Sequence, residues 1–554
     1  MKINTKKNLL SFLSLFGIIV AINILGHFYF KRFDLTDDKR YTLSDSTIEL
    51  LKSIDEPLFI DVFLDGKFPP EFKRLQNETK QLLEEFSSHN SNLMFQFTNP
   101  LEDENNAQQY IAELTNLGFL PTNINSTQKG KKEIIQIFPW AIANQGEKSV
   151  RVPLLVNNFG NTPAENINSS VQLLEFAFAD ALTKITKKEK KKIAILKGNG
   201  QMADKYQADC LLNLKEYYQL GEFNFDSLQD NPNKVLENLK RFDATLIIKP
   251  TEAFSDNEKY ILDQYIMNGG KSMWLMDKVI ADIDSLQNKN NASLAFPREL
   301  NVDDLFFKYG VRINYNLVQD LLSTPITAQS EQGDVPIDWL YSPIIKSENN
   351  HAINNNINLV KLEFTNTIDT LKNGIKKTIL LKSSPQSKAI GTPLEINLYE
   401  FMEGVDEQDF TKGNLPLGVL LEGSFTSAFK NRVRPFSDPT HLESGKDNKM
   451  IVIADGDIIN YSYVNKKPLL GGIDQWTQQV YGNKEFLLNA MNYLLDDNGL
   501  INIRNKEVKL AFLDKEKVNQ DYHSIQLLTV GLPLILLLLF ALAFIFWRKK
   551  TYAR

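Results

Sequence analysis

The stretch DATLIIKPTEAFSDNEKYILDQYIMNGGKSMWLMD, residues 243–277, decides the fold of this chain. It contains two short apolar runs, Ala244–Ile248 and Ser272–Met276, and runs of this kind are typical of strands buried inside a sheet. Between them, Asp256–Met267 is predicted to form a helix. A strand, a helix and a second strand in this order indicate parallel pairing, so this stretch places the chain in the α/β class.

The same pattern continues on both sides of this stretch. Lys192–Leu196 is predicted to be another buried strand, and a helix over about 202–220 follows it. Far along the chain, Ile451–Ala454 has the same apolar character, and Lys484–Leu495 is a predicted closing helix. Repeated strand–helix pairs predict a doubly wound parallel sheet whose crevice lies at the carboxyl ends of the strands.

Short alternating segments fill most of the region between about Asn316 and Lys449, which we interpret as a β-rich elaboration of this second α/β unit. Its expected strands are Val360–Phe364, Thr378–Leu381, Leu394–Tyr399 and Leu417–Glu422.

A smaller α/β unit is predicted ahead of the sheet, and a long amphipathic helix, Ala164–Ile185, joins the two. The smaller unit is predicted to run strand, helix, strand, helix and hairpin, an order that resembles thioredoxin. The expected elements are a short helix capped by Ser44 or Asp45, strands Leu58–Leu64 and Leu93–Phe97, helices over about 70–88 and 105–116, and a hairpin of Lys131–Ala143 and Ser149–Leu155 with its turn at Asn144-Gln145-Gly146. The unit has no cysteine, which excludes thioredoxin chemistry.

The two ends of the chain are strongly apolar. Leu9–Phe30 and Ile525–Trp547 contain no formal charge. Each is long enough for the roughly 20 apolar residues that cross a membrane as a helix. The alternative for the first segment is a cleaved signal peptide, but its apolar run is too long and no small-residue cleavage site follows it.

Flanking cations predict the orientation of both spans. Arg548, Lys549 and Lys550 follow the second span, and lysines precede the first. Positive charge favours the cytoplasmic side, so we expect both termini in the cytoplasm and the body between the spans on the periplasmic side of the inner membrane. The first span also carries Ser14, Gly17, Ala21 and Asn23, which are small or polar. Small side chains let helices approach closely, so these four residues predict a helix–helix interface with a partner.

Composition supports a folded body of ordinary type. The hydrophobic content is 43%, and the net charge of −6 gives no electrostatic case for nucleic acid as a partner. A single cysteine, Cys210, excludes an intramolecular disulfide and a cysteine-based zinc site. The five histidines show no ligand spacing, so we expect no metal and no cofactor.

Polar residues at the predicted strand ends define a candidate crevice: Asn199, Gln201, Lys249, Thr251, Asp277, Asp455 and Asp457. Gly198-Asn199-Gly200 lies where phosphate-binding glycines occur, but this turn has no third glycine at the required spacing and no Gly-Lys-Ser/Thr, so a tight turn is preferred. Paired carboxylates such as Asp455 and Asp457 can hold a hard cation, although no calcium-binding loop surrounds them and a structural turn is preferred. The chain shows no nucleophile on a strand-to-helix elbow.

Several stretches together resemble one family. They are RFDLTDDKRYTLSDST after the first apolar segment, IAILKGNGQ, residues 243–277, LLKSSPQSK, GVLLEGSFTSAFKNR, and GNKEFLLNAMNYLLDDNGLINIR before the second. This set is similar to the GldG family of gliding-motility-associated ABC transporter auxiliary proteins, often labelled substrate-binding components. The resemblance implies a multi-span permease subunit and a cytoplasmic ATPase subunit as partners. It also implies that the second unit has a class I glutamine amidotransferase-like fold without the catalytic Cys-His pair.

One departure from the family concerns the candidate crevice. Relatives tend to have Gly-His-Gly-Glu where this chain has Gly198-Asn199-Gly200-Gln201. Neutral amides keep hydrogen-bonding capacity but remove acid–base and metal chemistry. The resemblance therefore favours a non-catalytic protein.

The sequence thus predicts a doubly membrane-anchored, non-catalytic periplasmic subunit of an ABC-type transporter complex required for gliding motility and envelope export. Two alternatives stay open: an envelope hydrolase or amidotransferase-like enzyme, and a scaffold without a small-molecule ligand. An unknown envelope substrate is a possible partner. The expected order is a cytoplasmic tail (1–8), a transmembrane helix (9–30), a first α/β unit (31–160), a connecting helix (161–191), the second α/β unit (192–315), its β-rich elaboration (316–449), its closing part with a juxtamembrane segment (450–524), a transmembrane helix (525–547) and a cytoplasmic tail (548–554).

Overall fold

The computed structural model describes residues 12–20, 42–66, 68–102, 107–128, 131–158, 160–187, 189–225, 231–330, 333–346, 349–459, 463–464, 467–468, 473–496, 499–505 and 515–552. Internal contacts divide the chain into two compact units, Met1–Lys506 and Glu507–Arg554.

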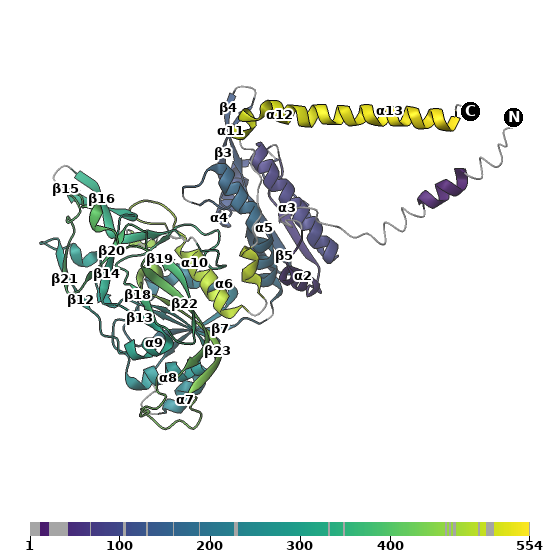
Figure 1. Ribbon diagram of the computed structural model, residues 1–554. Coiled ribbons are helices and arrows are strands. Elements are labelled where there is room, and N and C mark those ends of the chain that lie inside the picture. Colours follow the sequence, from purple (N-terminus) through teal and green to yellow (C-terminus); the bar gives the residue numbers. More distant parts are fainter. Residues whose placement is uncertain are drawn as a thin grey trace. The chain divides into compact units, whose positions relative to one another are not determined.

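A seven-stranded sheet forms the centre of the larger unit (Figure 1), in the order β19-β22-β23-β10-β9-β7-β8. Five adjacent strands of this sheet are parallel. They are β23 (Ser444–Ile453), β10 (Lys271–Leu275), β9 (Ala244–Ile248), β7 (Lys192–Lys197) and β8 (Gln219–Asn224). The predicted parallel sheet is therefore confirmed, and the apolar runs of the sequence are its central strands.

Helices cover both faces of this sheet because successive side chains of a strand point to opposite sides. Ile247 packs in one core with α7 (Pro232–Leu239), α8 (Asp256–Met267) and α9 (Asp303–Tyr309), whereas its neighbours Leu246 and Ile248 pack in a second core with α6 (Asp204–Tyr217) and α10 (Asn483–Leu495). This arrangement explains why the strands are apolar on both faces.

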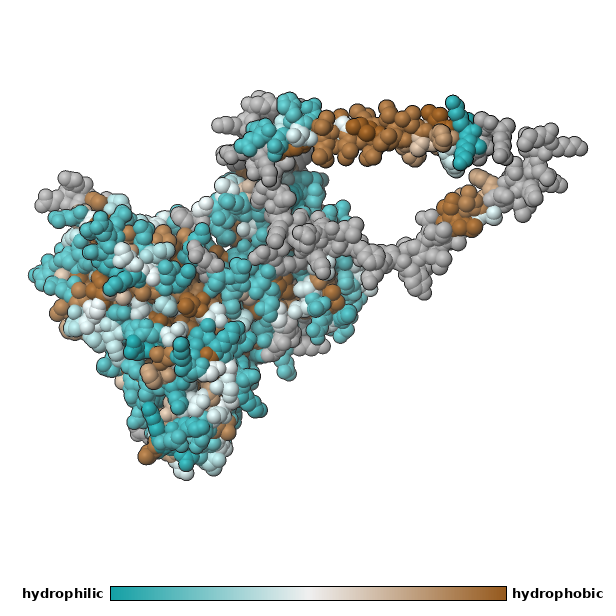
Figure 2. Space-filling view, in the orientation of Figure 1, coloured by the Kyte–Doolittle hydropathy of each residue, from teal (hydrophilic) through white to brown (hydrophobic). Residues whose placement is uncertain are grey.

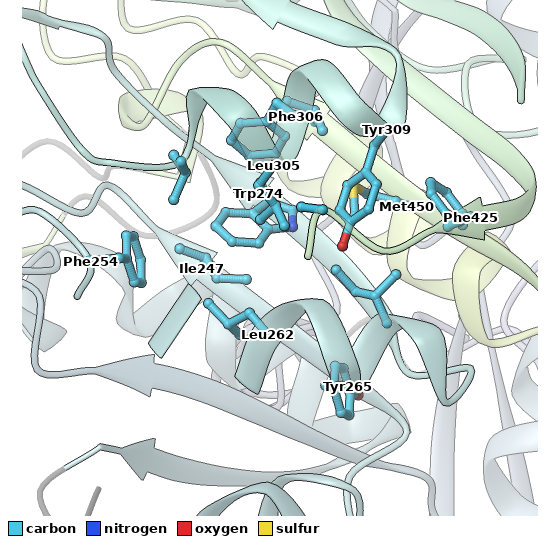
Figure 3. Packing of buried hydrophobic residues seen from close by; sticks show 14 of the residues in the cluster. Ile247, Phe254, Leu262, Tyr265, Trp274, Leu305, Phe306, Tyr309, Phe425 and Met450 are labelled. Atoms are coloured by element: carbon cyan, nitrogen blue, oxygen red, sulfur yellow. The ribbon is translucent and has the colours of Figure 1, made fainter. Parts of the chain in front are cut away.

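Aromatic side chains fill the first of these cores. Trp274 of β10 is fully buried, and its ring centroid lies 5.0 Å from that of Phe306 on α9 and 6.1 Å from that of Phe254. Figure 3 shows these rings beside Leu262 of α8. The edge-on contacts fix α8 and α9 on the sheet and so position the strand ends that carry the candidate site.

The β-rich region differs from the expectation in one respect. Two of its strands, β22 (Pro416–Thr426) and β19 (Lys376–Lys382), extend the main sheet in antiparallel pairing with β23 and with each other. Its other strands form smaller sheets, several of which pack around a core that contains Trp339. Within residues 316–449 the strands of these sheets are β14 (Asn316–Asp320), β15 (Ser323–Ser330), β16 (Gly333–Ile345), β17 (Val360–Lys361), β18 (Ile368–Thr370), β20 (Ser387–Gly391) and β21 (Leu394–Asn397). Three further strands of these sheets lie ahead of the predicted region: β11 (Val279–Ile280), β12 (Ala292–Pro297) and β13 (Val311–Ile313).

A four-stranded sheet in the order β2-β1-β5-β6 forms the first α/β part of the same unit. β1 (Leu58–Val62) is parallel to β2 (Leu93–Phe97) and antiparallel to β5 (Trp140–Gln145), which pairs with β6 (Lys148–Pro153). The helices of this part are α2 (Asp45–Lys52), α3 (Pro70–His89), α4 (Ala107–Asn116) and the long α5 (Pro163–Thr186). The Ser44 side chain caps α2 as predicted.

The predicted arm Lys131–Ala143 is wrong as a single strand. It divides into β4 (Lys131–Ile137) and β5, and β4 pairs with β3 (Thr122–Gln128), a strand that was not predicted. Pro139 lies at the break, and a proline cannot donate the backbone hydrogen bond that a continuous strand needs. The expected helix over 202–220 is similarly too long, because it ends at Tyr217 and β8 follows.

The smaller unit is mainly one long apolar helix, visible in Figure 2 as a rod of hydrophobic side chains. The helix Tyr522–Lys550 spans 29 residues; its most apolar 18-residue window has a mean hydropathy of 2.8, and none of that window is buried within the protein. Its residues belong to α12 (Tyr522–Gln526), a π-helical turn (Leu527–Gly531) and α13 (Leu532–Tyr552), which continues two residues beyond Lys550. Pro533 is the second residue after the π-helical turn, and its ring removes one backbone donor from the helix. The second predicted span is thus a helix long enough to cross a membrane.

The first predicted span falls partly outside the described residues. Residues 12–20 are helical and their large apolar side chains are exposed, for example Leu13 at 57%. Residues 9–11 and 21–30, which include Ala21 and Asn23, lie outside the residues that the structure describes. The N-terminal span and its interface stay predictions.

Candidate functional site

Four of the seven predicted crevice residues meet at the carboxyl ends of three adjacent parallel strands. Lys249 directly follows β9, Asp277 follows β10, and Asp455 and Asp457 follow β23. The Lys249 Nζ atom lies 2.6 Å from a carboxylate oxygen of Asp457 and 3.5 Å from one of Asp277. One carboxylate oxygen from each of the three aspartates lies within 4.8 Å of the others. We call these four residues the aspartate–lysine cluster.

Backbone groups hold the cluster in place. The Gly456 N–H donates to Asp277 Oδ1 at 2.5 Å, and the Asp457 N–H donates to Asp455 Oδ1 at 2.7 Å. Position 456 needs a glycine because the Lys249 side chain lies close to it: a Cβ atom at position 456 would be 2.7 Å from the Lys249 Cβ. Lys249 itself has φ +46°, a conformation that costs energy for a residue with a Cβ atom.

The other three predicted residues form a separate hydrogen-bonded turn. The Asn199 N–H donates to Gln201 Oε1 at 2.8 Å, and the Thr251 N–H and hydroxyl donate to the carbonyls of Asn199 and Gly200 at 3.0 and 2.8 Å. Asn199 also donates to Glu258 at 3.3 Å. A Cβ atom at Gly200, whose φ is +65°, would collide with the Thr251 hydroxyl oxygen. These contacts support the tight-turn interpretation of Gly198-Asn199-Gly200.

A segment of the β-rich region covers the aspartate–lysine cluster, and sequence reasoning missed it. The Glu363 N–H donates to Asp455 Oδ2 at 2.6 Å, and the Asn366 N–H donates to the Ala454 carbonyl at 2.9 Å. Asp455 is fully buried and Asp277 is 3% exposed. The strand-end edge that is open in many doubly wound sheets is therefore filled at this point by the chain's own residues.

Nothing in the sequence around Glu363 and Asn366 indicates this role. They lie about 90 positions before the strand end that they contact, and they match no motif. The only hint is their position within the β-rich elaboration. Close by, Lys361 and Asp474 form a second ion pair at 2.7 Å, and this pair also escaped prediction.

Charge balance in the cluster is unequal, since three carboxylates share one ammonium group. Burial raises the pKa of Asp457 to about 7, against an opposing effect of Lys249. Burial and the neighbouring Asp277 hold the pKa of Asp455 well above its usual range. Burial alone would lower the pKa of Lys249, but Asp277 and Asp457 raise it above the ordinary lysine value. Close carboxylates in a buried site oppose one another's ionisation, so Asp455 and Asp457 hold their protons more tightly than free aspartates do.

This arrangement limits the chemistry of the cluster. Three carboxylate oxygens could bind a hard cation, but the Lys249 ammonium already occupies the position of the counter-charge. Elsewhere, Cys210 of α6 is 2% exposed, and burial raises the pKa of its thiol to about 12. A thiol in that environment is a poor nucleophile.

Comparison with known proteins gives matches over most of the chain. Residues 190–490 match the family described as an ABC-type uncharacterized transport system, and residues 37–144 match a domain of unknown function, DUF7088. An uncharacterized protein of Borreliella burgdorferi is 22% identical over 539 residues, which cover 94% of each chain. Among solved structures, the mmIFT52 N-terminal domain shares 11% identity with a TM-score of 0.30, covering 55% of this chain and 98% of that one. A score of that size supports no argument about fold or function.

The family match contains every strand of the seven-stranded sheet and all four residues of the aspartate–lysine cluster. It extends over more than half of the chain. The protein therefore belongs to the ABC-type uncharacterized transport system family of auxiliary components.

Proposed function

We propose that this protein is a non-catalytic, membrane-anchored subunit of an ABC-type transporter, assembled with a multi-span permease subunit and a cytoplasmic ATPase subunit. The observation that carries the proposal is the exposed helix Tyr522–Lys550 in a chain of a transport-auxiliary family. An apolar helix of this length that the protein itself does not bury needs a lipid or protein environment. The full phosphate-binding pattern Gly-x-x-x-x-Gly-Lys-Ser/Thr does not occur in the sequence, because its Gly-Lys-Ser at residues 270–272 has Tyr265 in place of the first glycine. We therefore assign ATP hydrolysis to a partner.

The proposed topology puts both termini in the cytoplasm and the α/β body in the periplasm. Arg548, Lys549 and Lys550 support a cytoplasmic C-terminus. The apolar segment 9–30 would supply the second crossing, with Ser14, Gly17, Ala21 and Asn23 facing a permease helix.

The buried aspartate–lysine cluster supports a binding or gating role over an envelope enzyme. Its polar atoms bond to one another and to the backbone, whereas a catalytic group must reach a substrate. A scaffold without a small-molecule ligand is equally compatible with this closed strand-end edge.

Two finer assignments belong to the proposal. Strand order β2-β1-β5-β6 with one parallel pair supports a thioredoxin-like topology for the first α/β part. The parallel sheet with helices on both faces supports an amidotransferase-like second part. The role in gliding motility and envelope export rests on the sequence resemblance.

Purification of the full chain from its native membranes in mild detergent tests the assembly. We expect permease and ATPase subunits to co-purify in a fixed ratio. A matched variant has residues 525–547 replaced by an unrelated apolar span; it should stay in the membrane and lose part or all of its partners. Recovery of the unaltered chain without a permease would overturn the proposal. Normal gliding of a strain that lacks the protein would overturn only the motility assignment.

A further inference from the structure

Helix α4 is amphipathic, yet its apolar stripe is uncovered. Tyr110 and Leu114 of α4 and Leu117, the residue directly after it, follow one another at helical spacing on one side, and no residue of α4 is buried. Tyr110 is 41% exposed and Leu117 is 65% exposed. An amphipathic helix in a folded protein normally gains its stability by burying such a stripe, so the exposed stripe of α4 needs an explanation.

The carboxyl end of α4 is nevertheless fixed to the sheet. The Arg151 side chain donates to the Leu117 carbonyl at 3.1 Å, and the Trp140 indole donates to the Leu120 carbonyl at 2.8 Å. Phe119 is 3% exposed, and its ring packs edge-on against Trp140 at a centroid distance of 5.9 Å. The stripe is therefore presented from a supported helix, and a partner would not have to order it.

A groove of about 350 Å³ lies along the stripe. It is lined by the stripe, by one further residue of α4 and by residues within 99–102, which follow β2. The lining residues are Asn99, Pro100, Glu102, Tyr110, Glu113, Leu114 and Leu117. The charged residues among them, Glu102 and Glu113, are both acidic. The volume falls within the usual range of about 300–1,000 Å³ for ligand sites.

We propose that this groove, which we call the α4 groove, is a docking site for a short segment of a partner protein in which apolar side chains are flanked by lysine or arginine. The stripe fits one or two apolar side chains, as in helix-in-groove recognition. The acidic rim complements flanking cations, which gives selectivity and faster association. The same rim disfavours anionic lipid headgroups as the occupant.

Two synthetic peptides test the proposal on the full chain in neutral-lipid nanodiscs, with empty nanodiscs as the blank. Both carry two leucines at helical spacing; one has lysine and the other glutamate at the flanking positions. We expect fluorescence anisotropy to show that the lysine peptide binds at least about tenfold more tightly, a difference of about 1.4 kcal/mol.

Matched variants assign the binding to the groove. Leu117→Asp should weaken binding of the lysine peptide by about tenfold or more. Leu212→Asp is the control, since Leu212 lies on α6 outside the groove and is 61% exposed, close to the 65% of Leu117. The double variant Glu102→Lys with Glu113→Lys should reverse the preference toward the glutamate peptide. The substituted groove residues Leu117, Glu102 and Glu113 are all exposed. Circular dichroism should therefore show that these variants keep the fold of the unaltered protein.

Three results would overturn the proposal. Equal affinity for the two peptides would show that the acidic rim does not select flanking cations. Equal losses of lysine-peptide affinity in the Leu117→Asp and Leu212→Asp variants would show that the peptide does not bind in the groove. Self-association of the full chain that Leu117→Asp abolishes would identify a second copy, and not a basic segment of another protein, as the occupant.

Discussion

At the scale of single residues, Gly456 decides whether the aspartate–lysine cluster can form. A Cβ atom there would lie 2.7 Å from the Lys249 Cβ and 3.1 Å from a carboxylate oxygen of Asp277. We expect Gly456→Ala to lower the free energy of unfolding by about 1–3 kcal/mol, the usual cost of overpacking. Denaturant unfolding of the full chain in detergent measures this loss. Gly374→Ala is the control, since a Cβ atom at Gly374 has no neighbour within 4 Å; equal losses in both variants would contradict the close-contact argument.

The cluster also predicts a pH dependence. The pKa of Asp457 is about 7 in the folded protein, above 3.8 for a free aspartate, so the folded state binds the proton more tightly. Its contribution to stability is complete below about pH 4 and is lost as the pH rises through 7. Between pH 5 and pH 8 we therefore expect the free energy of unfolding to fall by on the order of 1–3 kcal/mol from this site.

Asp457→Asn isolates that contribution. The amide cannot titrate, so the variant should show a smaller fall in unfolding free energy between pH 5 and pH 8 than the unaltered protein. Taking the difference removes the opposite trend of His351, whose pKa burial lowers. Identical slopes in the two proteins would mean that Asp457 does not hold the proton.

The residues of this site that could be predicted from the sequence are those that lie next to a predicted strand. Asp277, Asp455 and Lys249 could be predicted because each directly follows a strand, and parallel neighbours bring their carboxyl ends together. Glu363 and Asn366 could not, because they reach the cluster through a long connection without a motif of its own. Local patterns specify which strand ends exist. The segment that covers them depends on tertiary packing.

At the scale of elements, the N-terminus of α8 links helix capping to the strand-end turn. The Ser255 side chain accepts from the Glu258 N–H, and Glu258 reaches back to the Ser255 N–H while also accepting from Asn199. We expect Ser255→Ala to lower the free energy of unfolding by about 1 kcal/mol, as for other N-caps. Ser88→Ala in the last turn of α3, where the hydroxyl is exposed, is the matched control and should change stability much less. An unchanged free energy of unfolding in Ser255→Ala would show that tertiary packing alone holds α8 in place.

Elements with strong periodicity were predicted almost to the residue, whereas weakly patterned ones were not. Ala244–Ile248 and Asp256–Met267 have the predicted bounds, because buried apolar runs and helix spacing are local signals. β8, with the sequence QLGEFN, was not predicted because it alternates too little, and its first two residues fall within the helix predicted over 202–220. β3 was missed for the same reason, since TNINSTQ is mostly polar.

At the scale of the whole molecule, the decisive prediction is the side of the membrane on which each part lies. The helix Tyr522–Lys550 is long enough for one crossing, and the cations at Arg548, Lys549 and Lys550 should keep its C-terminal end in the cytoplasm. A reporter that is active only in the cytoplasm should give signal when fused after Arg554. The same reporter inserted after Gly374, an exposed glycine, should be silent if the body is periplasmic.

A third fusion, at the N-terminus, separates one crossing from two. If segment 9–30 crosses the membrane as well, a fusion at the N-terminus should be active together with the one at Arg554, because an even number of crossings returns both ends to the same side. Activity at Arg554 with silence at the N-terminus would leave the C-terminal helix as the only crossing. Activity at Gly374 would place the body in the cytoplasm and exclude a periplasmic role for the α4 groove.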